Sequence, residues 1–279
     1  MTVENTPAET GKSEPVVAAK GLSKTFGEGS EQVEALRGID LTIQPGEFIS
    51  LIGPSGCGKS TLLRLIGDLL APTSGALTVN GKDPATARGD RDYGMVFQRA
   101  TLLDWRTVSK NVELPLEVMG SSSDERTAVA ARMLDLVQLG EFGEHYPWQL
   151  SGGMQQRVAI ARALTFQPRL LLMDEPFGAL DEMTREQMQQ EVLRIWRETE
   201  TSIVFVTHSI PEAVFLSSRV IVMSARPGQI SDEIDTGLPY PRDDDTRESQ
   251  EFFDRITEVR EALRRQERGA GPATEATQP

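Results

Sequence analysis

With 279 residues and a formal net charge of −13, the chain is long enough for one large domain or for one domain with an added lobe. Hydrophobic residues make up 38% and charged residues 25%, which is a globular balance. The acidity argues against general binding to nucleic acids or to an anionic bilayer, because both carry negative charge. The single cysteine, Cys57, excludes a disulfide within the chain and fits a reducing compartment.

Residues 1–14 are rich in Thr, Glu and Pro and lack the apolar core of a signal peptide, so we expect a disordered leader there. Elsewhere the apolar runs are short, as at residues 170–173. A membrane-spanning helix needs about 20 predominantly apolar residues. We therefore expect any role at a membrane to depend on partner chains.

The first structural unit combines a strand, a glycine-rich turn and a helix. Strand-like segments at residues 16–19 and 39–43 precede it, and a short apolar run at 47–52 leads into the turn. Apolar residues then recur at helical spacing, namely Leu62, Leu63, Ile66, Leu69 and Leu70. This order predicts a loop held between the end of a strand and the start of a helix.

The turn matches the P-loop pattern G-x-x-x-x-G-K-[ST], which binds nucleotide phosphates. It consists of Gly53, Pro54, Ser55, Gly56, Cys57, Gly58, Lys59 and Ser60, and Thr61 follows it. Glycines let backbone N–H groups surround the phosphates, and the following helix directs the positive end of its dipole at them. Lys59 is suited to the β- and γ-phosphates and the Ser60 hydroxyl to Mg²⁺, whereas only the backbone of Cys57 is needed. The alternative is an accidental glycine-rich turn, which the flanking strand and helix disfavour.

Two strands and a helical lobe are predicted next. Residues 75–79 form a strand candidate that ends in an Asn-Gly turn, and residues 93–97 form another. Ser122 and Glu125 then have the spacing of a capping box, at the start of a helical pattern over 122–140. We expect residues of about 100–160 to form a helical lobe inserted into an α/β domain.

A second chemical motif is the apolar run at residues 170–173, which ends in two carboxylates, Asp174 and Glu175. A parallel strand that is buried on both faces has such a continuous apolar sequence, and ligands bind at the carboxyl ends of such strands. Asp174 is suited to hold Mg²⁺, and Glu175 to polarise an attacking water. Alone, the pair would read as a solvated acidic loop; a P-loop in the same chain favours the functional interpretation.

The rest of the chain continues the α/β pattern and then becomes charged. We expect a helix over 182–198, followed by strands at 203–206 and 220–223. Beyond residue 243 an apolar stripe predicts an amphipathic helix that packs on the body or on a partner: Phe252, Ile256, Val259 and Leu263. Residues 268–279 are rich in Gly, Ala, Pro and Thr, and we expect them to be disordered.

The segment 150–157, Leu-Ser-Gly-Gly-Met-Gln-Gln-Arg, resembles the signature motif of ABC transporter ATPases. Physically, Ser151, Gly152 and Gly153 form a turn that opens a helix, which is a second anion-binding helix start. A simple helix cap explains the turn equally well. Many other P-loop ATPases lack the motif, so the resemblance is specific.

The resemblance covers about residues 16–230 and implies roles for further positions. Gln98 resembles the Q-loop glutamine that senses the γ-phosphate and Mg²⁺, and Asp181, after Ala-Leu, resembles the D-loop aspartate. His208 resembles the switch histidine that contacts the γ-phosphate. Phe26 resembles the aromatic that stacks on adenine, although a core phenylalanine is the alternative.

The implied fold is a RecA-like α/β P-loop ATPase core with an antiparallel β subdomain and an inserted α-helical subdomain. The ATPase domain would span residues 15–230, and residues 231–267 would form a C-terminal extension. The implied assembly is a head-to-tail homodimer with ATP at the interface. One subunit would supply Lys59, Gln98, Glu175 and His208 for catalysis and Ser60, Gln98 and Asp174 for Mg²⁺. Its partner would close the site with Ser151, Gly152, Gly153 and Gln155.

Two short segments, 102–108 and 224–228, resemble the nitrate, sulfonate and taurine importer branch of this family. That branch implies an ATPase subunit bound peripherally at the cytoplasmic face of the inner membrane. It would energise integral membrane permease subunits that receive solute from an extracytoplasmic binding protein, with no nucleic-acid partner. The alternatives are an exporter ATPase subunit, a soluble non-transport ABC ATPase, or a catalytically inactive regulatory subunit.

Overall fold

The computed structural model describes residues 14–269 of the chain. The predicted leader, residues 1–14, and the predicted tail, residues 268–279, lie almost wholly outside this range. Within it, no helix combines the length and the apolar composition that crossing a bilayer requires.

The centre of the molecule is a six-stranded sheet in which five neighbouring strands are parallel and one edge strand is antiparallel. In spatial order the strands are β5 (Tyr93–Val96), β6 (Leu170–Asp174), β7 (Ser202–Val206), β3 (Phe48–Ile52), β8 (Arg219–Met223) and β9 (Ile230–Asp235). β3 and β7 are buried along their whole length. This explains their mostly apolar sequences, because both faces of a central parallel strand are covered.

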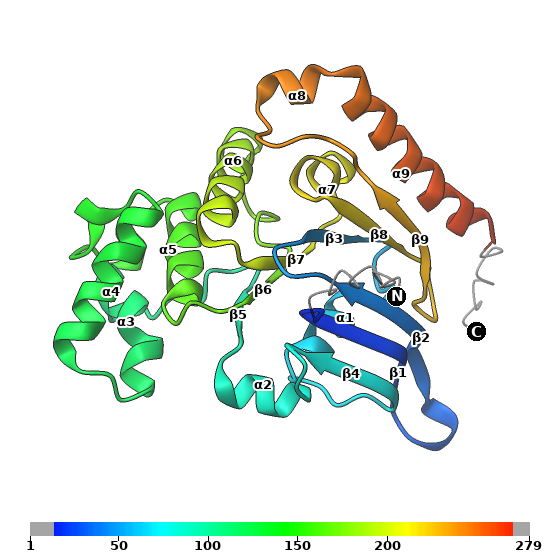
Figure 1. Cartoon of the computed structure of the whole chain (residues 1–279), viewed down its shortest axis with the longest axis horizontal. Coiled ribbons are helices and arrows are strands. Elements are labelled where there is room, and N and C mark those ends of the chain that lie inside the picture. The colour runs from blue at the N-terminus through cyan, green and yellow to red at the C-terminus, as the bar shows by residue number, and fades with distance from the viewer. Residues whose placement is uncertain (1–13, 270–279) are drawn as a thin grey trace, which may run out of the picture.

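A second, antiparallel sheet stands against the first (Figure 1). Its strands, in spatial order, are β2 (Val33–Ile43), β1 (Val17–Phe26) and β4 (Ser74–Val79). Gly75 adopts a positive φ of 89°, and an added Cβ would lie 2.4 Å from the Gly21 carbonyl oxygen. Glycine at this position therefore lets β4 approach β1 closely.

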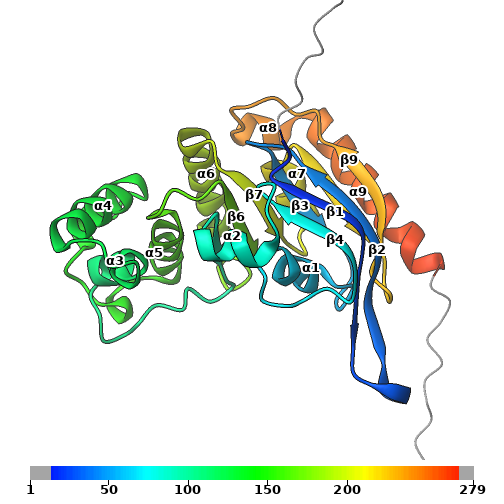
Figure 2. The ribbon, with the colours of Figure 1, turned by 60° about the horizontal axis from the view of Figure 1, so that its bottom comes forward.

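The helices fall into three groups (Figures 1 and 2). α1 (Lys59–Ile66) follows the P-loop, and α2 (Pro84–Asp90) follows β4. α3 (Val108–Val118), α4 (Ser123–Leu136) and α5 (Gly152–Leu164) form a lobe to one side of the sheets. The remaining helices are α6 (Glu182–Thr199), α7 (Ile210–Leu216), α8 (Asp244–Glu248) and α9 (Gln250–Gly269).

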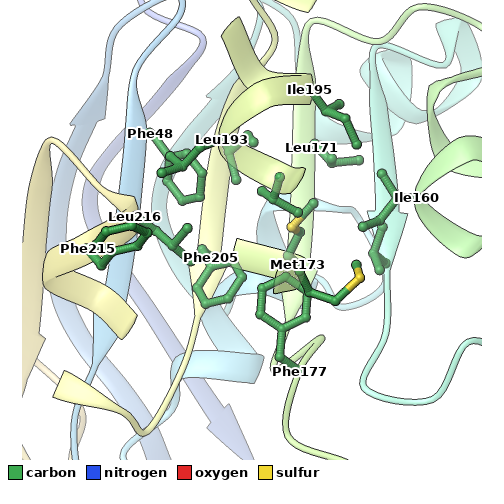
Figure 3. Packing of buried hydrophobic residues seen from close by; sticks show 14 of the residues in the cluster. Phe48, Ile160, Leu171, Met173, Phe177, Leu193, Ile195, Phe205, Phe215 and Leu216 are labelled. Carbon is green, nitrogen blue, oxygen red and sulfur yellow. The ribbon is translucent and has the colours of Figure 1, made fainter. Parts of the chain in front are cut away.

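Two apolar clusters cover the two faces of the parallel sheet. Because side chains alternate along a strand, Phe48 of β3 lies in one cluster and Ile49 in the other, and Phe205 and Val206 of β7 divide in the same way. Figure 3 shows Phe48 and Phe205 in the first cluster, which also includes Phe215 of α7. Phe252, Ile256 and Val259 of α9 are buried in this cluster too, so the C-terminal stripe packs on the body of the molecule.

The structure has the predicted α/β architecture, but several elements differ from the sequence expectations; α2 and α7, for example, were not predicted. The helix that begins at Lys59 ends at Ile66, whereas its apolar pattern continued to Leu70. Gly67 caps this helix and Asp68 has a positive φ, so Leu69 is left 49% exposed. The strand β9 was not predicted, because only its two isoleucines are apolar and it lies at the sheet edge.

Candidate active site

The P-loop connects the end of β3 to the start of α1, and its glycines are required by close packing. Gly58 has φ = 100°, and a Cβ there would lie 2.5 Å from the Leu36 side chain and 3.0 Å from the Ala35 carbonyl oxygen. At Gly53 a Cβ would lie 2.6 Å from the Met223 carbonyl oxygen. Any larger residue at either position would displace the loop.

The side chain of Lys59 folds back into the P-loop. Its Nζ donates to the Gly53 carbonyl at 2.8 Å and to the Pro54 carbonyl at 3.2 Å, and its side chain is only 4% exposed. The neighbouring Cys57 thiol is also buried, and burial raises its pKa above the ordinary value. A raised pKa makes the thiolate, the nucleophilic form of cysteine, less accessible.

The P-loop and the acidic strand end meet directly. Ser60 Oγ donates to Asp174 Oδ1 at 2.8 Å, although 114 positions separate the two residues in the chain. β3 and β6 carry them to the same edge of the sheet, with β7 between the two strands. Hydroxyl and carboxylate oxygens, the ligands that Mg²⁺ prefers, are thus placed side by side.

Glu175 and His208 form the second pair at this edge. His208 Nε2 lies 2.5 Å from Glu175 Oε1. Glu175 has a positive φ of 49°, and its backbone N–H donates to the Val206 carbonyl at 3.0 Å, so the carboxylate turns away from the end of β6 toward the neighbouring strand. The His208 side chain is 46% exposed, and the pair is therefore accessible from solvent.

Two adjoining pockets include this pair. The first, of about 210 Å³, is lined by the P-loop and the first turn of α1 and also by Glu175 and His208. The second, of about 340 Å³, contains Glu175 and His208 together with Gln98 and Gly178. Gln98 lies against Gly178, where an added Cβ would be 2.9 Å from Gln98 Nε2. The predicted P-loop, carboxylate, Q-loop and histidine residues thus meet around one site.

The 150–157 segment is placed differently. Ser151 is the N-cap of α5, and its hydroxyl accepts from the Met154 N–H at 3.3 Å. Gly153 packs against α6, where a Cβ would lie 2.7 Å from the Thr184 methyl group. Gln155 Nε2 donates to the carbonyls of Pro147 and Leu150, so this amide holds the turn together. Among the described residues of this chain, those that line the two pockets do not include Ser151 or its neighbours.

Asp181 and Phe26 lie at the margins of the site. Asp181 caps α6 by accepting from the Thr184 N–H at 3.0 Å, and hydrogen bonds from Thr184 hold the pKa of its carboxyl below the ordinary value. Phe26 ends β1 and is 40% exposed, with Lys24 Nζ 5.1 Å from its ring centroid. The ring is therefore available to a ligand and is not a core phenylalanine.

Sequence reasoning missed several residues around this site. Ala35 lines the first pocket, while Arg185, Thr207 and Glu212 line the second. Thr207 follows the end of β7 directly and Glu212 lies in the first turn of the next helix, α7, so polar residues after a buried strand were the available signal. Ala35 carries no chemical signal at all, because its position depends on how β2 folds over the P-loop.

Comparisons with known proteins agree with this geometry. A family model described as ABC transporter matches residues 36–178. The nitrate import ATP-binding protein of Synechocystis sp. is 46% identical over 254 residues, covering 88% of this chain and 94% of the relative. The taurine import ATP-binding protein of Yersinia pestis is 48% identical over 200 residues, covering 72% and 78% respectively.

A solved structure is similar as well. It is described as the dimeric, post-hydrolysis state of an ATP-binding cassette bound to ADP and Pi. It has 39% sequence identity and a TM-score of 0.68, and the match covers 78% of this chain and 98% of the solved chain.

Proposed function

This chain belongs to the family of ABC transporter ATP-binding proteins, and we propose that it is the ATPase subunit of an importer for nitrate, taurine, a sulfonate or a similar small solute. As a member of this family it hydrolyses ATP to energise transport. The observation that carries the proposed site is the meeting of the P-loop with the Glu175–His208 pair around one pocket.

In the proposed site each side chain has a separate task. The P-loop backbone, from Gly53 to Ser60, and Thr61 surround the phosphates of ATP, with Lys59 as the cation next to the terminal groups. Phe26 stacks on the adenine ring. Glu175 orients the attacking water and accepts its proton, and His208 and Gln98 contact the γ-phosphate side of the site.

Mg²⁺ fits the donor set at this site. Ser60 Oγ and Asp174 Oδ1 already lie 2.8 Å apart, and Gln98 adds an amide oxygen on the adjoining pocket. Within residues 14–269 no group of three or more His, Cys, Asp or Glu side chains is arranged as a protein cage for a metal. This is consistent with an ion held partly by phosphate oxygens, where it would neutralise charge that develops on the transferred group.

The signature segment supports a composite site. Ser151 and Gly152 are exposed, whereas Gly153 is buried, and all three lie outside the pocket that contains Lys59. We therefore propose a head-to-tail homodimer in which Ser151, Gly152 and Gly153 of each subunit, held in shape by Gln155, meet the γ-phosphate bound by the other. The D-loop residue Asp181 would lie at the same interface.

The relatives support a proposal for the direction of transport and for the remaining partners. The names of two similar proteins specify nitrate import and taurine import. We propose that this chain likewise acts peripherally, at the cytoplasmic face of the inner membrane, on separate permease subunits supplied by an extracytoplasmic binding protein. An exporter subunit or a soluble ABC ATPase is the competing function.

A growth and uptake experiment separates these functions. The gene is deleted in its host, and radiolabelled nitrate, taurine and an alkanesulfonate are offered in turn. An importer subunit predicts loss of uptake for one solute class, restored by the wild-type gene but not by Lys59→Ala, because that variant lacks the phosphate-binding cation. Undiminished uptake of all three solutes, with retention of some other compound inside the deleted strain, would favour an exporter.

A further inference from the structure

A chain of polar side chains links the C-terminal extension to the backbone beside His208. Arg247 Nη2, from α8, donates to Gln189 Oε1 of α6 at 2.6 Å. Gln189 Nε2 donates to Glu212 Oε1 of α7 at 3.2 Å, and the Thr207 hydroxyl donates to the other Glu212 oxygen. Thr207 Oγ1 in turn accepts from the Ser209 backbone N–H at 3.0 Å. Thr207 and Ser209 are the two residues that flank His208.

The middle of this chain is buried. Gln189, Glu212 and Thr207 are each almost inaccessible to solvent. Burial raises the pKa of the Glu212 carboxyl, while the hydrogen bonds from Thr207 and Gln189 act in the opposite direction. A buried carboxyl group depends on the donors that surround it. If Glu212 lost the bond from Gln189, the Thr207 hydroxyl would be held less firmly in its present orientation.

Arg247 and Glu212 together define which way the Gln189 amide faces. A guanidinium has only donors, so it must take the amide oxygen, and the Glu212 carboxylate takes the amide NH₂ group. Without Arg247 the amide oxygen would lose this buried donor, and only the single 3.2 Å bond to Glu212 would still hold the amide in place.

Arg247 is itself fixed in place. Its guanidinium carbon lies 3.5 Å from the ring centroid of Phe215, and its side chain is only 17% exposed. Asp244 Oδ1 of the same helix lies at the limit of an ion pair, 4.0 Å from Arg247 Nε.

We propose that Arg247 is a positioning residue for His208, acting through Gln189, Glu212 and Thr207. The C-terminal extension then has a function in hydrolysis and is not only a packing element. This inference rests on the proposed role of His208 at the γ-phosphate. It predicts that loss of Arg247 slows the chemical step but leaves nucleotide binding intact, because the P-loop lies outside the chain of contacts.

The test compares purified wild-type protein with Arg247→Met, which preserves much of the side-chain volume but has no donor. We expect kcat to fall about fivefold, with less than about a twofold change in the Kd for ATP. Arg247→Lys keeps a donor and a cation beside Phe215, so we expect it to recover most of the rate. Gln189→Met should lower kcat similarly, and adding Arg247→Met to it should have little further effect, because both break the same chain.

The matched control is Arg265→Met. Arg265 also anchors the extension, through an ion pair of 2.7 Å with Asp232 that joins α9 to β9. It takes no part in the hydrogen bonds that connect Arg247 to Thr207. We expect its kcat to stay within about twofold of the wild type. The inference is wrong if Arg247→Met leaves kcat unchanged, if Arg265→Met lowers it equally, or if the Arg247 and Gln189 effects multiply.

His208→Ala separates this inference from the function on which it rests. If His208→Ala leaves kcat unchanged, the proposed role of His208 is wrong and the inference falls with it. If His208→Ala abolishes turnover while Arg247→Met does not slow it, only the inference is wrong. If Arg247→Met does not fold, the test uses Arg247→Lys and Gln189→Met. A lower kcat of Gln189→Met with intact ATP binding supports the inference, and an unchanged kcat of Gln189→Met contradicts it.

Discussion

The position of the Glu175 carboxylate is set by the backbone as much as by its side chain. The left-handed φ of 49° and the N–H bond to Val206 turn the residue off the end of β6, so that its carboxylate meets His208. A glutamine has nearly the same size and can adopt the same conformation, but its neutral amide is a much weaker base. Replacing Glu175 by glutamine therefore removes the base and leaves the local structure unchanged.

We predict that Glu175→Gln retains ATP binding but lowers turnover by about 100-fold or more, the range expected for loss of a general base. ATP should then hold the variant as a stable dimer, which size-exclusion chromatography with and without ATP would detect. Glu182→Gln, an exposed change on nearby α6, serves as the control and should behave as wild type. Normal turnover by Glu175→Gln would show that another group activates the water.

Some residues of the proposed site belong to short sequence motifs, whereas others are defined only by contacts between distant positions of the chain. Lys59, Ser60 and Asp174 belong to short local motifs, so they could be named before the fold was known. The Ser60–Asp174 contact itself follows from parallel strands that end at one edge. Arg247 could not be predicted, because its contact with Gln189 spans 58 positions and depends on how α8 packs across α6 and α7.

At the scale of elements, the segment after β5 is a rigid loop with an exposed apolar tip. Gln156 of α5 donates to the Phe97 carbonyl at 3.0 Å, and Arg162 donates to the carbonyls of Ala100 and Thr101. Buried Asn111 of α3 bonds the backbone further along the same segment. Hydrogen bonds from α5 and α3 thus hold the loop in place. A movement near Gln98 would therefore move the whole loop.

Trp105 is the exposed tip of this loop, at 75% exposure, whereas Leu102 packs partly against the core. We predict that Trp105→Ala shifts the Tm of the isolated subunit by less than about 2 °C, because an exposed side chain contributes little to folding. Co-purification with the permease and solute uptake should both fall, because exposed tryptophans are frequent anchors of interfaces.

Phe253→Ala is the control for this variant, since Phe253 is another exposed aromatic but lies on α9. It should change neither permease binding nor uptake. A Trp105→Ala subunit that melts several degrees lower while still binding the permease would assign Trp105 to the core and contradict its predicted role in contacting the permease.

For the whole molecule, the main question is why the chain has two separate helix starts of the kind that can bind anions. α1 begins in the pocket that contains Lys59, whereas α5 begins at exposed Ser151 in the helical lobe. A composite site explains this separation, because each pocket would be completed by the helix start of the other subunit. The solved structure at 39% identity is itself described as dimeric, which supports the same assembly.

Two heterodimers, each purified through different tags on its two subunits, test this explanation. A heterodimer of one Lys59→Ala subunit and one Ser151→Arg subunit would concentrate both lesions in one composite site and leave the other intact. It should retain about half of the wild-type rate, although both parent homodimers are inactive, as expected for isologous interfaces. The matched heterodimer combines a wild-type subunit with a Lys59→Ala/Ser151→Arg subunit; it has the same lesions, but one in each site, and should be inactive. If each subunit instead used its own Ser151, the two heterodimers would exchange these results, so measuring both phosphate-release rates decides between the two arrangements.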